Sequence, residues 1–294
     1  MPELPEVETM CRGIRSIVGR RVIAASTPPC ACRPCLIQPG IDRIHAAIAG
    51  RTITAIERRG KRVMLRLEGN DRLIIEPRMT GLVLLADPPD PDHLRLRLEL
   101  SSVPYDSTQH EPSDQMLVWD RRGLGTIRLM NEDDYREHID NVLGIDALVI
   151  SCDQLRDRAA SSRRPIKVAL LDQTKVAGIG NLYAAEMCFV AGIDPRTRCD
   201  RLTVPHGKRL HAAISTVLLP AIEAEGSTLS DGTYRNALNR NGGYQNMHRV
   251  YDKADTSCPR CHEGRIRRIV QAQRSTFFCP KCQRRSGCHH LVAC

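Results

Sequence analysis

Two pairs of cysteines near the C-terminus constrain the fold of this chain more than any other feature. Cys258 and Cys261 form one Cys-x-x-Cys pair, Cys279 and Cys282 form a second, and 17 residues separate the pairs. Four thiolates at this spacing are typical of a closed tetrahedral zinc site, which folds a segment too small to have a core of its own. We therefore expect one structural Zn²⁺ held by these residues. Redox-active thiols, or iron bound by the same sulfurs, are the alternatives.

The segment between the two pairs is expected to form a β-hairpin. Residues Gln271 to Phe278 contain β-forming side chains that suit one strand of it. Arg274 would project from this hairpin.

The balance of charges indicates a polyanionic partner. The 294-residue chain has 43 Lys and Arg against 34 Asp and Glu, a formal net charge of +9. Nucleic acid is the first candidate partner and an acidic membrane surface is the second, although some soluble proteins are simply basic. From Thr256 to Cys294 the sequence contains a single acidic residue, Glu263, among many arginines. Aromatic residues make up 3% of the chain, which disfavours a row of stacking platforms for single strands.

The location of the protein is inferred from what the sequence lacks. It has no N-terminal secretory pattern and no apolar stretch of membrane-spanning length. We expect a soluble cytoplasmic protein, associated with the nucleoid. Its 13 cysteines are then not expected to form a disulfide framework.

Hydrophobic periodicity indicates an α+β protein with three parts. Short alternating runs between residues 50 and 130, such as Leu94 to Leu100, predict a β-sandwich or barrel. From about residue 132 the pattern is helical, with Gly192 placed to end one helix. We expect an N-terminal domain over 1–131, a helical domain over 132–249 and a zinc-binding module with a tail over 250–294. The stretch 226–247 is rich in Gly, Ser and Asn and is expected to form a long mobile loop.

The first residues carry a candidate nucleophile. A small residue such as Pro2 usually allows removal of Met1, which would leave a secondary amine beside the Glu3 carboxylate. An α-amino group has a pKa of about 7.7–8.0, so part of it is unprotonated at neutral pH. Attack of a secondary amine on a sugar C1′ gives an iminium ion that favours elimination. The alternative is that Pro2 and Glu3 only begin a helix, which the apolar spacing predicts from Leu4 to Val18.

A glycine-rich turn precedes another predicted helix. Gly178 and Gly180 lead into Asn181, and such a turn exposes backbone N–H groups at the positive end of a helix dipole, where phosphate binds. Arg163 and Lys167 on the preceding segment favour this interpretation. The alternative is a solvated basic face.

Further basic and apolar residues lie at predicted turns. Lys61 is at a strand start, Met79 and Leu124 lie in glycine-containing turns, and Arg122 lies beside Leu124. They could line a basic groove from which apolar wedges enter a base stack. The alternatives are that Lys61 is simply exposed to solvent and that Met79 and Leu124 are core side chains. His93 lies before the alternating strand, and a histidine at such a position more often has a structural role than a ligand contact.

In their order along the chain, these motifs resemble the formamidopyrimidine-DNA glycosylase/endonuclease VIII family. Pro-Glu-Leu-Pro-Glu-Val-Glu at 2–8 resembles the formamidopyrimidine branch, the residues at 178–186 resemble the family's helix–two-turn–helix motif, and those at 273–279 resemble its zinc-finger hairpin. The resemblance covers nearly the whole chain. It implies an N-terminal β-sandwich with a leading helix, a helical middle, a C-terminal zinc-finger hairpin, and duplex DNA as the partner of a monomer.

The resemblance also implies residue roles. Pro2 would be the Schiff-base nucleophile, Glu3 the proton donor, Lys61 an assistant in β-elimination, and Arg274 a participant in δ-elimination. DNA contacts are implied or expected at a larger set of positions: Met79, His93, Arg122, Leu124, Arg163, Lys167 and Asn181.

Some positions depart from the family pattern. Leu124 replaces a phenylalanine, Glu76-Pro77 replaces His-Leu, and Ser162 stands where a basic residue is expected. Residues 104–113 form an added loop. The cluster Cys30, Cys32 and Cys35 matches no family role and is interpreted as free thiols, with a second metal site as the alternative.

The expected function is that of a bifunctional DNA glycosylase and AP lyase in base excision repair, which removes oxidised purines such as 8-oxoguanine and formamidopyrimidines. A zinc-containing protein that binds damaged DNA without cutting it is the first alternative. A preference for oxidised pyrimidines is the second, and a role on RNA or in assembly has no support beyond charge.

Overall fold

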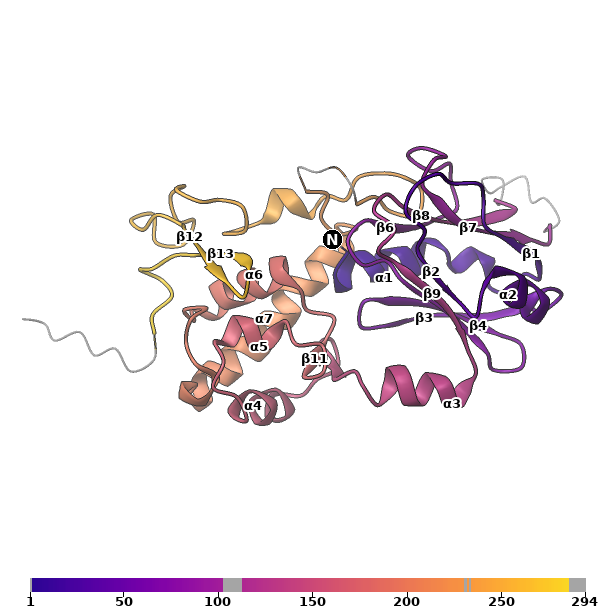
Figure 1. Cartoon of the computed structure of the whole chain (residues 1–294). Helices are drawn as coiled ribbons and strands as arrows, with labels where there is room; N and C mark the ends of the chain where they lie inside the picture. Colours follow the sequence, from indigo (N-terminus) through magenta and orange to yellow (C-terminus); the bar gives the residue numbers. More distant parts are fainter. Residues whose placement is uncertain (1, 103–112, 230–231, 233, 286–294) are drawn as a thin grey trace, which may run out of the picture. The chain divides into compact units, whose positions relative to one another are not determined.

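The computed structural model describes residues 2–102, 113–229, 232 and 234–285 (Figure 1). The chain divides into two compact units. The first contains Met1–Val142 and Ala221–Gln245, and the second contains Leu143–Pro220 and Asn246–Cys294. These boundaries differ from the three domains expected from the sequence, because residues 132–142 and 221–245 belong to the first unit. Most of the loop expected over 104–113 is outside the described residues.

The first unit contains two β-sheets (Figure 1). The four-stranded sheet has the order β1 (Val22–Ser26), β7 (Leu94–Leu100), β8 (Gln115–Asp120) and β6 (Gly81–Leu84). The five-stranded sheet has the order β2 (Leu36–Gln38), β9 (Thr126–Met130), β5 (Arg72–Glu76), β4 (Arg62–Leu67) and β3 (Ile53–Arg59). All neighbours are antiparallel except β2 and β9.

One hydrophobic core lies between the sheets, which confirms the predicted β-sandwich. In the five-stranded sheet Val63 is paired with Ile75 and Ile75 with Ile127, so all three point to the same face, and all are buried. From the four-stranded sheet, Leu96 and Leu98 join the same core. Alternation with a period of two therefore places one side of each strand in this interior.

Helices close the edges of the sandwich. The leading helix α1 (Leu4–Gly13) contacts β3 and β4 of one sheet and β6 of the other. It ends at Gly13 and continues as a short 3₁₀ turn, η1 (Arg15–Ile17), before the expected end at Val18. Helix α2 (Ile41–Ile48) contacts β1 and β2 and was not predicted.

Two further segments complete the first unit. Helix α3 (Glu132–Tyr135) and the π-helical turn η2 (Arg136–Asp140) follow β9. Arg72 holds this segment to the sheet, because it forms an ion pair of 2.6 Å with Glu132 and lies over the Tyr135 ring at 4.3 Å. In the segment expected as a mobile loop, Tyr234 and Ala237 are 3% and 1% exposed and belong to the core of this unit. That expectation is corrected for the described residues, because these side chains pack with the sandwich.

The second unit is mainly helical. Its helices are α4 (Cys152–Ala160), α5 (Ile166–Leu170), α6 (Asn181–Ala191), η3 (Cys199–Arg201) and most of α7 (Val204–Glu223). The last residues of α7, from Ala221, belong to the first unit, and η4 (Tyr244–Met247) also spans the boundary between the units. Strands β10 (Ile145–Asp146) and β11 (Val176–Ala177) pair in parallel, and β12 (Arg267–Gln271) and β13 (Arg274–Phe278) form the expected hairpin. Gly192 ends α6 with φ +68°, as the sequence predicts.

In the part of the chain that the structure describes, no helix combines the length and apolar character needed to cross a bilayer.

Candidate active site and nucleic-acid interface

The start of α1 holds Pro2 and Glu3 in a defined position. Both residues are buried, and Glu3 precedes the first turn of the helix. The Glu3 amide donates to Oε2 of Glu6 at 2.9 Å, and the other Glu6 oxygen accepts the Ser227 amide at 2.9 Å. Glu6 is 2% exposed, so its carboxylate is a buried tie between the helix start and the returning segment of the same unit.

Lys61 lies in the two-residue turn between β3 and β4. Gly60 precedes it with φ +58°, a conformation that glycine adopts without the steric cost of a side chain and that suits a tight hairpin. Arg58 ties this hairpin to α1, because its Nε donates to Glu8 at 3.0 Å and its NH1 donates to the Gly60 carbonyl at 3.0 Å. The unit therefore fixes Lys61 relative to the helix that begins after Pro2 and Glu3.

The charge of Glu8 is maintained by its partners. Burial acts to raise the pKa of this carboxyl, but hydrogen bonds from Arg12 and Arg58 outweigh it and lower the pKa below its ordinary value. Glu8 is thus a carboxylate at neutral pH and a stable partner for Arg58.

Arg122 and Leu124 lie in a turn after β8 that is organised by Asp120. The Asp120 side chain accepts the Arg122 amide at 3.2 Å and the Gly125 amide at 2.7 Å, and it also accepts the Thr80 hydroxyl. Asp120 is 1% exposed, whereas Arg122 is exposed and Leu124 is half-buried. A buried carboxylate therefore supports a turn that presents its basic side chain outward.

Met79 follows the segment Glu76-Pro77, which departs from the family pattern. Met79 is 37% exposed, so the core alternative for this side chain is wrong. It follows Arg78, which has φ +54° and pairs with Glu76 at 2.9 Å. Glu76 also pairs with Arg62 at 3.0 Å, so it serves as an anchor for two arginines at the end of β5.

His93 is placed by two neighbours. Its Nδ1 lies 2.6 Å from Asp90 Oδ1, and its ring meets Trp119 edge-on at 5.6 Å between centroids. Desolvation opposes ionisation of Asp90, but the hydrogen bonds from His93 and Trp119 lower the pKa of its carboxyl. His93 is half-buried.

In the second unit Lys167 lies in the interior, so the alternative of a solvated basic face is wrong for this residue. Its side chain is fully buried, and its ammonium donates to Asn181 Oδ1 at 2.6 Å, to Thr276 Oγ1 at 2.8 Å and to the Ser275 carbonyl at 3.3 Å. Asn181 Nδ2 also donates to the Ser275 carbonyl at 3.1 Å. Lys167 thus joins the first residue of α6 to strand β13, and Arg163 remains exposed.

The glycine-rich turn before α6 is partly used within the protein. Gly178 has φ +104°, and its amide donates to Gln173 Oε1 at 2.9 Å. That N–H group therefore does not face a ligand. The predicted phosphate contact in this region depends on Asn181 and on the start of α6.

The four predicted zinc ligands come together in the second unit. Their Sγ atoms lie within 4.8 Å of one another, with 3.7 Å between Cys258 and Cys282 and 3.8 Å between Cys261 and Cys279. A tetrahedral site with Zn–S bonds of about 2.3 Å requires S–S separations of about 3.8 Å. The donor set and spacing therefore fit one Zn²⁺, with no position open for catalysis.

The hairpin between the ligand pairs presents Arg274 at its tip. Arg274 is paired with Gln271, and the turn residues Ala272 and Gln273 have φ +46° and +59°. Arg274 is exposed, as predicted.

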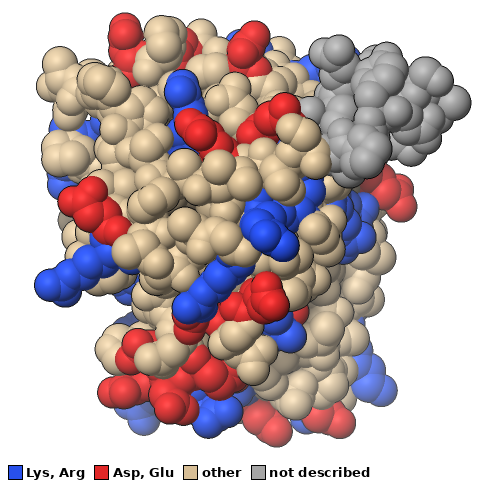
Figure 2. All heavy atoms as spheres, turned by 90° about the vertical axis from the view of Figure 1, so that its right-hand side faces the viewer, with Lys and Arg blue, Asp and Glu red and all other residues tan. Residues whose placement is uncertain are grey.

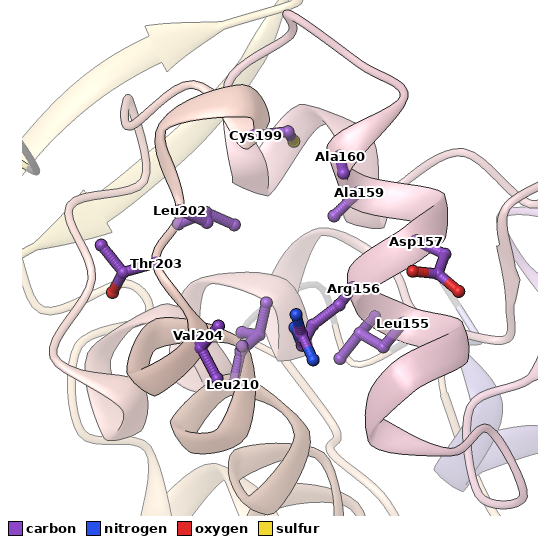
Figure 3. Close-up of a pocket in the computed structure, with 11 residues that line it drawn as sticks. Leu155, Arg156, Asp157, Ala159, Ala160, Cys199, Leu202, Thr203, Val204 and Leu210 are labelled. Carbon is purple, nitrogen blue, oxygen red and sulfur yellow. The ribbon is translucent and has the colours of Figure 1, made fainter.

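Three other features of the described residues are not part of the candidate site. The pocket in Figure 3 has a volume of about 120 Å³ and is lined mainly by apolar residues of α4, η3 and α7, and it contains none of the predicted site residues. Figure 2 shows acidic and basic side chains intermixed on one face, so that face is not a continuous basic surface. Among the described residues, Cys30, Cys32 and Cys35 are not gathered as a metal site.

Sequence analysis missed the residues that support the site, namely Glu6, Arg58 and Asp120. For Glu6 the available signal was a carboxylate directly after Pro5 in the first turn of the predicted helix. For Asp120 the available signal was a carboxylate at a strand end directly before Arg-Arg-Gly.

The comparisons with known proteins agree with this arrangement. Sequence models of the formamidopyrimidine-DNA glycosylase N-terminal domain, of its H2TH domain and of the zinc finger found in FPG and IleRS match residues 1–127, 143–233 and 257–285. A formamidopyrimidine-DNA glycosylase from Chloroflexus aurantiacus is 38% identical over 96% of this chain and 98% of its own length. One from Streptococcus mutans is 32% identical over 97% of this chain and 100% of its own length.

Solved structures of Fpg proteins also match this chain over nearly its whole length. Lactococcus lactis Fpg in complex with DNA containing an abasic site has a TM-score of 0.82 and 31% identity, covering 96% of this chain and 100% of that one. MutM (Fpg) from Thermus thermophilus has a TM-score of 0.81 and 34% identity, covering 96% of this chain and 98% of that one. With its β-sandwich, helical unit, four-cysteine zinc site and full-length relatives, the chain belongs to the formamidopyrimidine-DNA glycosylase family.

Proposed function

We propose that this protein is a bifunctional DNA glycosylase and AP lyase that removes oxidised purines from duplex DNA in base excision repair. The observation that carries the proposal is the start of α1, where Glu6 holds the amide of Glu3, the residue directly after Pro2, in the same unit as Lys61. The relatives support it by name, and the Lactococcus lactis structures contain DNA with an abasic site or with N7-benzyl-Fapy-dG.

The proposed reaction begins at the Pro2 nitrogen. Removal of Met1 converts this nitrogen from an amide, which is not nucleophilic, into a secondary amine. The amine attacks C1′ of the damaged nucleotide, the C1′–base bond breaks, and Glu3 supplies a proton during ring opening or base departure. The resulting iminium has no N–H proton to lose, so it acts as an electron sink for elimination. Lys61 assists the β-elimination, and Arg274 assists the δ-elimination and binds phosphate.

Access to C1′ requires that the damaged nucleotide leave the stack. Flipping costs a few kcal/mol and is easier for a damaged base than for a sound pair. Met79, Arg122 and Leu124 would occupy the gap, with two of these side chains already presented by the turn that Asp120 supports. His93, Arg163 and the α6 start at Asn181 would contact DNA, and Lys167 would act indirectly by orienting Asn181.

Borohydride trapping tests the nucleophile. Wild-type protein should form a covalent adduct with a duplex containing 8-oxoguanine, and Pro2→Gly should lose most of this adduct. Pro5→Ala, a change at the other proline of the same helix start, is the matched control and should still be trapped. Unchanged trapping of Pro2→Gly would show that the nucleophile is assigned wrongly.

Two further measurements separate the alternatives. A mature mass that includes Met1, together with DNA binding and no cleavage, would indicate a protein that binds damaged DNA without cutting it. Faster cleavage of a thymine glycol duplex than of an 8-oxoguanine duplex would indicate a pyrimidine preference. Affinity for DNA should fall steeply with salt in either case, because phosphate contacts release counterions.

A further inference from the structure

A segment near the N-terminus packs on the turn that presents Arg122. A Cβ added to Gly123 would lie 2.1 Å from the Arg33 carbonyl oxygen, so residues 33–34 cover this glycine. The Leu36 amide donates to the Gly125 carbonyl at 3.3 Å. The segment 30–36 therefore forms the outer support of the turn, while Asp120 supports it from inside.

Arg95 connects Cys30 of this segment to the base of the turn. Its NH1 donates to Cys30 Sγ at 2.7 Å, while its Nε and NH2 donate to the Asp120 carbonyl at 2.9 and 2.8 Å. Arg95 is 2% exposed. A guanidinium at this depth depends on its hydrogen-bond partners, so the position of Cys30 Sγ affects how Arg95 holds Asp120.

Cys30 also lies close to a second thiol. The Cys32 amide donates to Cys30 Sγ at 3.4 Å, and the chain bends at Ala31 and Cys32. Two residues of extended chain span about 7 Å, and a bend shortens this toward the Cα separations of disulfides. Desolvation and a hydrogen bond with Cys30 raise the pKa of the Cys32 thiol. Cys30 is half-buried and Cys32 is exposed, so an oxidant can reach the pair.

The remaining cysteine of the cluster is less suited to this chemistry. Cys35 packs against the core, and burial raises the pKa of its thiol to about 11. The pKa of the Cys32 thiol is raised as well, so position decides between the two: Cys32 is exposed and its amide bonds to Cys30 Sγ, whereas Cys35 packs against the core. The reactive pair is therefore Cys30 and Cys32.

We propose that Cys30 and Cys32 form a peroxide-sensitive thiol pair whose oxidation to a disulfide loosens the turn that carries Arg122. The Cys30 sulfur attacks one oxygen of hydrogen peroxide, the O–O bond breaks, and the departing hydroxide takes the thiol proton to give water. The Cys32 sulfur then attacks the sulfenic sulfur, an S–S bond forms as the S–O bond breaks, and a second water leaves. Two sulfurs lose two electrons in total, and the peroxide gains them.

The disulfide acts on the turn through Arg95. Bonding to Cys32 draws Cys30 Sγ away from Arg95 NH1, and the buried guanidinium must find another acceptor. The shift reaches the Asp120 carbonyl and, through it, the turn with Arg122. The consequence for damaged DNA rests on the function proposed above, whereas the disulfide itself does not.

Peptide mass spectrometry tests the modification. After limited hydrogen peroxide and alkylation, Cys30 and Cys32 of the wild-type peptide should lack alkyl groups and the peptide should carry the mass of one disulfide, while Cys35 in the same peptide should be alkylated. Cys32→Ser should instead give a Cys30 sulfenic acid that dimedone traps. Cys152→Ser, which changes a half-buried cysteine of the other unit, is the matched control and should leave the disulfide unaffected. Zinc release is monitored so that only samples retaining the metal are compared.

Binding to a duplex with a tetrahydrofuran abasic-site analogue tests the coupling. Oxidised wild-type protein should bind about tenfold more weakly than reduced protein, which corresponds to the loss of roughly one hydrogen bond to a charged group, and dithiothreitol should restore binding. Cys32→Ser should show no such loss. Absence of the disulfide, or a disulfide without effect on binding, would overturn the proposal. If reduced protein fails to bind or cleave damaged DNA, the proposed function fails, and the mass measurement still decides the modification site.

Discussion

The role of Asp120 in holding the turn after β8 leads to a quantitative prediction for Asp120→Asn. The wild-type carboxylate accepts two backbone amides, from Arg122 at 3.2 Å and from Gly125 at 2.7 Å. An asparagine has one oxygen and one NH₂ group, so in either orientation it places a donor against one of these N–H groups. The substitution therefore removes at least one charge-assisted hydrogen bond at a site that is 1% exposed.

The magnitude follows from the number of bonds changed. A hydrogen bond to a charged group contributes about 1.5–3 kcal/mol, and a buried donor left without an acceptor adds a similar penalty. We expect Asp120→Asn to lower the free energy of unfolding of the first unit by about 2–4 kcal/mol. With a urea m-value of about 2–3 kcal/mol/M, the midpoint should fall by about 1 M.

Tryptophan fluorescence offers a local assay. The chain has one tryptophan, Trp119, which is 3% exposed and adjacent to Asp120 in β8. Its emission therefore reports unfolding of the first unit. Asp87→Asn, which makes the same change at an exposed position, is the matched control and should leave the midpoint within about 0.2 M. A wild-type midpoint for Asp120→Asn, with unchanged affinity for an abasic-site duplex, would refute the role assigned to this carboxylate.

Three other predictions follow from the structure. Because the folded-state pKa of Glu8 is lowered, its ionised form stabilises the protein at neutral pH, and this stabilisation should be lost as pH falls from about 4.5 through the folded pKa. Glu8→Gln should flatten urea midpoints over that range, and an unchanged acid profile would contradict the assignment. Cys279→Ser should abolish zinc binding, measured by metal analysis, and unfold the hairpin by circular dichroism, whereas full zinc content would exclude the four-cysteine site. Gly123→Ala should cost about 1–3 kcal/mol, because it combines φ +59° with a backbone clash, and Gly19→Ala, with φ +87° and open space, should cost less in the same urea assay.

Local sequence patterns were sufficient for much of the fold. Strand β7 was predicted from its alternation over Leu94 to Leu100, which are the bounds that the structure shows. Such a signal involves residues that are neighbours in the chain, so the physical cause can be seen in a short window. Helix α2 and strand β1 were missed, because they are short and their apolar faces become meaningful only against the rest of the sandwich.

The candidate site was predicted in part for the same reason. Several site residues belong to motifs that are compact in sequence, namely Pro2, Lys61, Arg274 and the zinc ligands. The catalytic and DNA-binding roles of the first three remain predictions. The burial of Lys167 could not be predicted, because its acceptors at Asn181 and Thr276 are 14 and 109 positions away. Whether Met79 is a core side chain could likewise not be predicted, and only its exposure in the folded unit shows that it is not.

The sequence by itself determined the strongly alternating strands, the four sulfur ligands and the identity of the groups that could react. The cause lies in local backbone preferences and in side chains whose chemistry does not depend on distant residues. Only the tertiary structure decided which polar groups are brought together: Glu6 with Ser227, Arg58 with Glu8, and Arg95 between Cys30 and Asp120. These pairings depend on the packing of distant segments, because a buried charge is stable only where the rest of the fold supplies its partner.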